Sequence, residues 1–159
     1  MQITIIASGS RGDVQPYVAL GAGLKTAGHT VRVLASQDFQ NLLTGHGLEF
    51  VDMGGNMQSI AQGMQSLIEQ GNMLKIMLSM GKAAEQLANQ SAMGGLAACD
   101  GSDLIISGLG GLFVGYALSQ KLGIPFVQAY LYPFTRTREF ASVLMPPTPM
   151  RLPGWANSL

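Results

Sequence analysis

The loop of residues 8–14 combines residue types that could carry out chemistry on a bound ligand. Gly9 and Gly12 have no side chain, so a ligand can approach the backbone closely. A helix that begins at this loop offers backbone N–H groups without partners, and such groups attract anions. Asp13 adds a carboxylate at the mouth of the loop, where it can accept a proton from a ligand. The same carboxylate could instead cap the helix, which is a common role of Asp.

A glycine-containing loop of this kind is typical of dinucleotide-binding proteins, but its spacing is wrong for them. The G-x-G-x-x-G pattern that starts at Gly9 needs glycine at positions 11 and 14, where the chain has Arg11 and Val14. Asp38, which could contact a ribose, lies beyond the end of the second apolar run. The G-x-x-x-x-G-K-[ST] pattern of a phosphate-binding loop is also absent. We therefore expect no nicotinamide dinucleotide cofactor.

Short apolar runs alternate with helical patterns along the chain. The apolar runs predict strands buried on both faces, at residues 3–7, 30–35, 48–51, 104–107 and 125–129. Apolar residues at helical spacing predict helices at residues 14–27, with Asp13 as cap, at 39–44, over a long region at 57–98 that breaks at 71–72, and at 112–122. The alternation predicts an α/β fold with a Rossmann-like, doubly wound parallel sheet.

Ligands of such sheets bind outside the carboxyl ends of the strands. By this rule three loops are candidates for the site, at residues 8–14, 108–111 and 132–137. Beyond Tyr130 the sequence predicts no further helix or strand.

The charge balance excludes some classes of partner. Nine Lys and Arg residues balance nine Asp and Glu residues, so the formal net charge at pH 7 is zero. We expect no nucleic-acid partner, because nucleic-acid-binding proteins carry basic surfaces. Charged residues make up only 11% of the chain, against roughly 25% in a typical soluble domain. This predicts either an unusually apolar domain or a part of a larger protein whose other part covers some of this surface.

Cysteine and histidine are too few for a metal centre. Cys99 is the only cysteine, and His29 and His46 have no carboxylates at ligand spacing. The N-terminus lacks the basic segment of a signal peptide, and no stretch reaches the ~18 apolar residues of a membrane-spanning helix. We therefore expect no metal and a cytoplasmic protein, which could touch a membrane from that side.

Several motifs together carry a family resemblance. They are Gly9-Ser-Arg-Gly-Asp-Val-Gln-Pro16, residues 20–24, 27–33, 103–107 and 117–125, and Pro133-Phe-Thr-Arg-Thr137. On these residues the chain resembles the N-terminal, acceptor-binding domain of GT-B glycosyltransferases of families 28 and 1. Within them it is most similar to sterol glucosyltransferases and to enzymes that glycosylate glycopeptide antibiotics and other natural products. The combination of the first motif with the last is specific, whereas either alone is weak.

The resemblance implies an inverting, metal-independent transfer of a hexose from a nucleotide diphosphate sugar, such as UDP-glucose, to an acceptor hydroxyl. Asp13 matches the position of the general base, and this role is favoured over that of a helix cap. Ser10, Arg11 and Gly12 match residues that face the sugar donor. Related enzymes of the plant type use a histidine in the first loop as base, supported by an Asp after the fourth strand. Here the first loop has no histidine and the position after the fourth strand carries Ser107 and Gly108, so any base role falls to Asp13 alone.

The resemblance also implies an apolar acceptor such as a sterol, a lipid or a polyketide. Met57, Met64 and Met77 lie in the region that forms the acceptor pocket of this family, and Gly108, Phe134 and Thr135 complete the candidate set. Methionines at helical spacing could equally be packed in the core. We expect a mixture, with part of the methionines facing the sheet and the rest lining a groove.

Length is the main departure from the family pattern. GT-B enzymes have two Rossmann-like domains, and the second binds the donor. We therefore expect residues 1–159 to be one truncated N-terminal domain, inactive without a C-terminal domain or complementary subunit as partner. Its uncovered face could also lead to self-association. The alternative hypothesis is a Rossmann-like module that binds a small molecule without catalysis.

Overall fold

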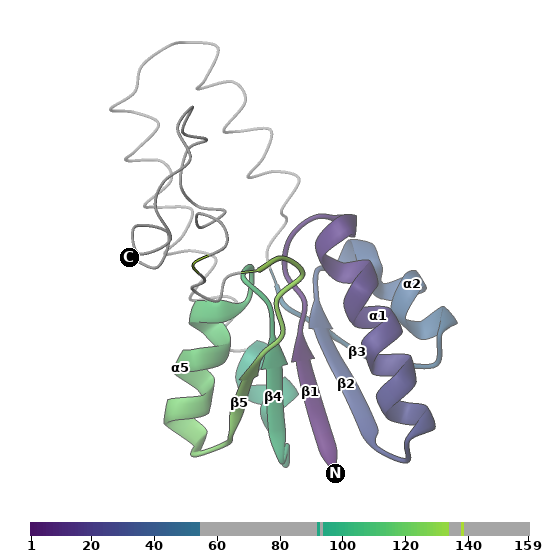
Figure 1. The fold of residues 1–159 in the computed structure, drawn as a ribbon. Coiled ribbons are helices and arrows are strands. Elements are labelled where there is room, and N and C mark those ends of the chain that lie inside the picture. The colour runs from purple at the N-terminus through teal and green to yellow at the C-terminus, as the bar shows by residue number, and fades with distance from the viewer. Residues whose placement is uncertain (55–91, 93, 134–137, 139–159) are drawn as a thin grey trace. The chain divides into compact units, whose positions relative to one another are not determined.

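The computed structural model of the chain describes residues 1–54, 92, 94–133 and 138 (Figure 1). The chain divides into two compact units, Met1–Ala129 and Tyr130–Leu159. The described residues of the second unit, 130–133 and 138, contain no helix or strand. The first unit contains every labelled helix and strand.

The first unit is built on a five-stranded parallel sheet (Figure 1). Its strands are β1 (Gln2–Ile6), β2 (Thr30–Ala35), β3 (Glu49–Asp52), β4 (Leu104–Ser107) and β5 (Phe126–Gln128). The order across the sheet is β3-β2-β1-β4-β5, and every neighbouring pair is parallel. This is the order of a doubly wound sheet, so the predicted fold class is confirmed.

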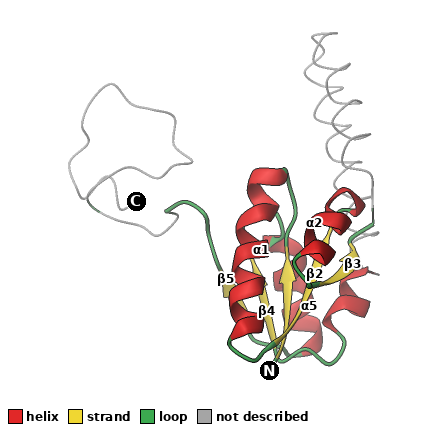
Figure 2. Cartoon of the chain, turned by 90° about the vertical axis from the view of Figure 1, so that its right-hand side faces the viewer, coloured by secondary structure: helices red, strands yellow, loops and turns green. Residues whose placement is uncertain are grey.

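Helices cover both faces of the sheet (Figure 2). They are α1 (Arg11–Thr26), the short η1 (Gln37–Phe39) and α2 (Gln40–Gly45), the helical residues 94–99, and α5 (Leu112–Leu122). Side chains of α1 and α2 pack on one face, and residues 94–99 and α5 pack on the other.

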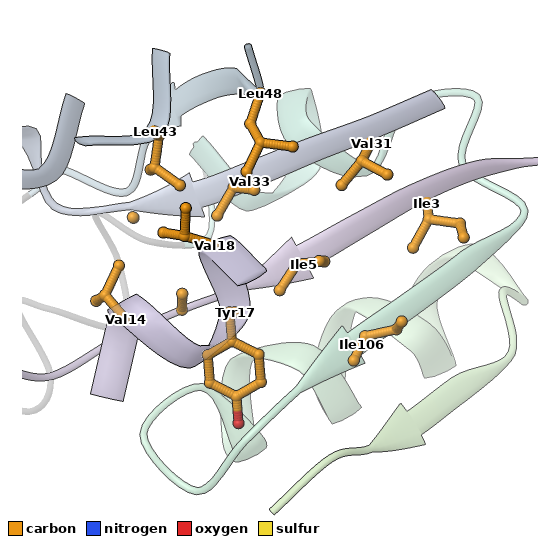
Figure 3. Packing of buried hydrophobic residues seen from close by; sticks show 12 residues of the cluster. Ile3, Ile5, Val14, Tyr17, Val18, Val31, Val33, Leu43, Leu48 and Ile106 are labelled. Atoms are coloured by element: carbon orange, nitrogen blue, oxygen red, sulfur yellow. The ribbon is translucent and has the colours of Figure 1, made fainter. Parts of the chain in front are cut away.

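The two faces of the sheet are separated by the alternation of side chains along each strand. Ile3 and Ile5 of β1 belong to the same cluster of buried residues as Val14 and Tyr17 of α1, and these side chains are labelled in Figure 3. Ile6, the next residue along β1, points to the opposite face and packs in a second cluster with residues of α5 and the 94–99 helix. Burial on both faces explains why β1 reads as a continuous apolar run.

One expectation about the start of α1 is wrong. The sequence predicts Asp13 as the cap of this helix, but the helix begins at Arg11, its N-cap is Ser10, and Asp13 lies in its first turn. Smaller differences affect the ends of β1, β3, β5 and α2, whereas β2, β4 and α5 have the predicted bounds. The long methionine-rich region at residues 57–98 lies largely outside the described residues, but its last part, 94–99, is helical as predicted.

Candidate functional site

The winding of the sheet reverses between β1 and β4. From β1 the chain continues into α1 on one face, and from β4 it continues into α5 on the other face. The loops that follow these two strands, at residues 7–10 and 108–111, therefore lead to opposite faces of the sheet from neighbouring strands. In a doubly wound sheet ligands bind at the carboxyl edge next to this switch point.

The two loops pack backbone against backbone. A Cβ atom at Gly110 would collide with the Ser8 carbonyl oxygen, and one at Gly111 would collide with Ser107 Oγ and lie 3.0 Å from the Ile6 carbonyl oxygen. The loop after β1 therefore explains the glycine at position 110, and the ends of β1 and β4 explain the one at position 111. The structure thus brings two of the three candidate loops together.

Asp13 is held by the residue that caps its helix. The backbone N–H and the hydroxyl of Ser10 both donate hydrogen bonds to Asp13 Oδ2, each at 2.8 Å. In the described part of the chain, no hydrogen bond reaches the other carboxylate oxygen, Oδ1. The side chain is half-buried. One oxygen of Asp13 is thus fixed by the loop, while the second can interact with a ligand.

Arg11 and Gly12 lie on the exposed first turn of α1. Arg11 Nε donates to Gln15 Oε1, one helical turn further on, at 3.2 Å. Its terminal guanidinium nitrogens have no hydrogen-bond partner among the described residues, so they can bind an anion. A Cβ atom at Gly12 would lie 3.6 Å from Ser10 Oγ, and no other described residue outside its own helical turn comes within 4 Å. The backbone of this turn is therefore open to approach.

Gly108 is buried rather than presented to a ligand. The Tyr17 hydroxyl occupies the space where a Gly108 Cβ would be, and it donates a hydrogen bond to the Ala129 carbonyl oxygen. Tyr17 of α1 therefore joins the loop after β4 to the end of β5. Sequence reasoning missed this role, because the apolar stripe of α1 accounts for Tyr17 as a core residue.

The remaining predicted acceptor residues are not part of the described structure. Met57, Met64, Met77, Phe134 and Thr135 all lie outside the described residues. Of the third candidate loop, only Tyr132 and Pro133 are described, and both are exposed.

An apolar groove of about 230 Å³ lies along α5 and is also lined by residues 92 and 96. It is lined by Ala92, Leu96, Phe113, Val114, Ala117, Leu118 and Lys121. Phe113 is 84% exposed, which is unusual for a phenylalanine. Sequence reasoning missed this groove, although adjacent apolar residues at 113–114 and 117–118 indicate a helix that is apolar on more than one side.

The thiol of Cys99 is buried between the 94–99 helix and the sheet. Burial raises the pKa of the Cys99 thiol to about 11, and the positive charge of Arg32 counteracts part of this rise. Such a thiol is protonated at neutral pH and is a poor nucleophile. Cys99 is therefore a core residue.

The described residues contain neither a metal-binding cluster nor a membrane-spanning helix. No three His, Cys, Asp or Glu side chains among them are grouped as a metal site would require. No helix among them has both the length and the apolar character needed to cross a membrane.

The chain is similar to curated sterol glucosyltransferases. It is 34% identical over 149 residues to a sterol 3-beta-glucosyltransferase of Debaryomyces hansenii, an alignment that covers 91% of this chain and 9% of that protein. It is 33% identical over 148 residues to the sterol 3-beta-glucosyltransferase of Glomerella lagenarium, covering 92% of this chain and 10% of that protein. The chain thus spans about a tenth of the length of these relatives.

Solved glycosyltransferases share the fold. The glycosyltransferase SsfS6 of Streptomyces sp. SF2575 superposes with a TM-score of 0.61 at 27% identity, over 82% of this chain and 39% of that one. The calicheamicin glycosyltransferase CalG4 superposes with a TM-score of 0.67 at 15% identity, over 81% of this chain and 32% of that one. The family profile of the glycosyltransferase family 28 N-terminal domain matches residues 3–141. The chain therefore belongs to glycosyltransferase family 28, and it corresponds to the N-terminal domain of that family's GT-B fold.

Proposed function

We propose that this chain is the acceptor-binding half of an inverting, metal-independent hexosyltransferase. The donor would be a nucleotide diphosphate sugar such as UDP-glucose, and the acceptor a hydroxyl of an apolar molecule. The observation that carries the proposal is the state of Asp13, at the carboxyl edge of the sheet, with Oδ2 held by Ser10 and Oδ1 without a partner among the described residues. No cofactor is required by this reaction.

The reaction assigns one step to Asp13. The acceptor oxygen attacks the anomeric carbon of the sugar while its proton passes to Asp13 Oδ1. The bond between the anomeric carbon and the diphosphate oxygen breaks, and its electron pair leaves with the nucleoside diphosphate. Attack from the side opposite the leaving group inverts the anomeric centre. The products are the glycosylated acceptor, the nucleoside diphosphate and protonated Asp13, which releases its proton to solvent.

The donor side of the site would be completed by another part of the enzyme. The chain covers only about two-fifths of the SsfS6 chain, so most of a two-domain enzyme lies outside it. The guanidinium nitrogens of Arg11 that have no partner among the described residues, and the Gly12 backbone that none of them covers, suit the oxygens of a diphosphate. We propose that these residues face the donor and that a C-terminal GT-B domain is the partner.

The proposed acceptor class rests on the relatives. The similar curated proteins are named sterol 3-beta-glucosyltransferases, so a sterol or another apolar molecule with a hydroxyl is the acceptor we propose. Met57, Met64, Met77, Phe134 and Thr135 remain the proposed contacts. Gly108, buried under Tyr17, would act on the acceptor only through the shape of its loop.

The test is a reconstitution of the two halves. This chain is mixed with a separately expressed C-terminal GT-B domain from the same genome, UDP-glucose and a panel of sterol and polyketide acceptors, and released UDP is measured. We expect acceptor-dependent release that falls by about 10²–10⁴ in both Asp13→Ala and Asp13→Asn. Asp38→Asn makes the same change at a carboxylate beyond β2 and should leave the rate unchanged.

The two Asp13 variants also separate a base from a residue that only stabilises the first turn of α1. Asparagine retains an oxygen that can accept the hydrogen bonds of Ser10 but cannot take a proton at neutral pH. A residue that only holds Ser10 would therefore give an active Asp13→Asn variant and an unstable Asp13→Ala variant. Full activity of Asp13→Asn would rule out the base role.

The groove along α5 favours a second candidate function, a module that binds an apolar small molecule without catalysis. Its lining is almost entirely hydrophobic, and it is open in the described part of the chain. Such a module would bind an apolar ligand tightly by itself, and Asp13→Asn would change nothing. Association of the two halves without UDP release, for any acceptor, would favour this function over the transferase.

A further inference from the structure

Both hydrogen-bond donors of Ser10 are already used. A serine residue has two N–H or O–H donors, the backbone amide and the hydroxyl. In this structure the amide and the hydroxyl each donate to Asp13 Oδ2 at 2.8 Å. Ionised Asp13 can only accept, so the hydroxyl must be the donor in this pair.

This geometry bears on what Ser10 can do for a sugar donor. The oxygens of a diphosphate accept hydrogen bonds and need N–H or O–H groups to bind them. Ser10 has no such group left while Asp13 is held, and its remaining hydroxyl lone pairs would repel a phosphate oxygen. Arg11, by contrast, has free N–H groups at its terminal nitrogens among the described residues.

The backbone of the loop is shaped to allow the contact. Gly9 has a φ of 132°, a region that residues with a side chain rarely adopt. A Cβ atom on Gly9 would lie 2.5 Å from Asp13 Oδ2 and 2.8 Å from Asp13 Cγ. The absence of a side chain at Gly9 therefore lets the carboxylate fold back onto Ser10.

We propose that Ser10 is a positioning residue for Asp13 and not a ligand of the sugar donor. This inference rests on the proposed function. The χ2 angle of an aspartate is broadly distributed, so a free carboxylate presents either oxygen in many directions. Two hydrogen bonds to Oδ2 fix the plane of the group and leave Oδ1 as the oxygen that takes the acceptor proton. The reacting geometry is thereby set before the acceptor binds.

The test separates positioning from donor binding by steady-state kinetics of the reconstituted enzyme. For Ser10→Ala we expect kcat to fall about tenfold, because one of two hydrogen bonds to a charged group is lost, while KM for UDP-glucose stays within about twofold. Ser10→Thr should restore most of kcat, because threonine keeps the hydroxyl and the N-cap backbone is extended, at φ −78° and ψ 175°. Arg11→Ala should show the opposite pattern, with a raised KM for UDP-glucose.

A matched control removes a serine hydroxyl elsewhere. Ser119 Oγ donates to the Ile124 carbonyl oxygen at 2.7 Å, at the far end of α5, so Ser119→Ala should lower the melting temperature without changing kcat. A raised KM for UDP-glucose at unchanged kcat in Ser10→Ala would overturn the inference and leave the transferase intact. Full activity of Ser10→Ala would overturn it as well. If the wild type shows no acceptor-dependent release although the halves associate, the proposed function fails and the inference with it.

Discussion

Gly9→Ala should lower the activity of the candidate site because the new side chain would collide with Asp13 Oδ2. The new Cβ would lie 2.5 Å from Asp13 Oδ2, whereas ordinary contacts begin near 3.4 Å, so the carboxylate must move by about 1 Å. A misplacement of about 1 Å costs roughly 10²-fold in rate. The φ of 132° adds backbone strain of about 1–3 kcal/mol. We therefore expect both lower activity and lower stability.

Gly28→Ala is the control that separates these two effects. Gly28 also has a positive φ, of 87°, but a Cβ atom added there would have no neighbour within 4 Å in the part of the chain that the structure describes. Both variants should melt earlier, by about 2–4 °C for each kcal/mol, as measured by differential scanning calorimetry. Only Gly9→Ala should lose about 10²-fold in the UDP-release assay. Equal activity of the two variants, at temperatures well below both melting points, would refute the steric reasoning about Asp13.

Three other predictions concern the first unit. Arg32 Nη1 donates to the Ala98 carbonyl oxygen at 2.8 Å, so Arg32→Met should lower the free energy of unfolding, measured in urea, by about 1.5–3 kcal/mol. Glu49 forms an ion pair with Arg32, but its side chain is 51% exposed, so Glu49→Gln should lower the same free energy by less than about 1 kcal/mol. The pKa of Cys99 is raised from 9.0 to about 11, so the unfolded chain loses this proton first and the free energy of unfolding should fall as the pH rises from 9 to 11; Cys99→Ala should abolish this slope. Ala117→Phe should fill the groove along α5 and reduce the fluorescence of bound anilinonaphthalene sulfonate, and an unchanged signal would mean that the dye binds elsewhere.

The strands could be predicted closely because burial on both faces leaves a strong pattern. β2 and β4 have their predicted bounds, and both are apolar, β-branched runs between polar turns. The helix α5 also has its predicted bounds, because Gly123 adopts a φ of 68° at its C-cap, a conformation that favours glycine. The alternation of strands and helices predicts a doubly wound parallel sheet, and the observed order β3-β2-β1-β4-β5 belongs to that class.

The start of α1 could not be resolved from the sequence because two good capping residues compete there. Ser10 and Asp13 are both favoured at an N-cap, and they are three residues apart. With serine at the cap, the aspartate falls at the third helical position, where its carboxylate can reach back to the Ser10 amide. Pattern alone shows that both residues belong to the loop, but it does not show that one holds the other.

The glycines after β4 show that a glycine in a loop does not by itself indicate a ligand site. From sequence, residues 108–111 formed a candidate ligand loop because they follow a strand of the predicted sheet. In the structure the space beside these glycines is taken by the protein itself: by the Tyr17 hydroxyl at Gly108, by the Ser8 carbonyl at Gly110 and by Ser107 Oγ at Gly111. A glycine in a loop indicates that some group approaches the backbone closely. Whether that group is a ligand or another part of the protein depends on contacts between residues about a hundred positions apart, which the sequence pattern does not show. Of the five glycines in the loops after β1 and β4 and in the first turn of α1, Gly12 is the one with no described neighbour closer than 3.6 Å. We therefore expect a ligand of the candidate site to approach the backbone at the first turn of α1, next to Asp13.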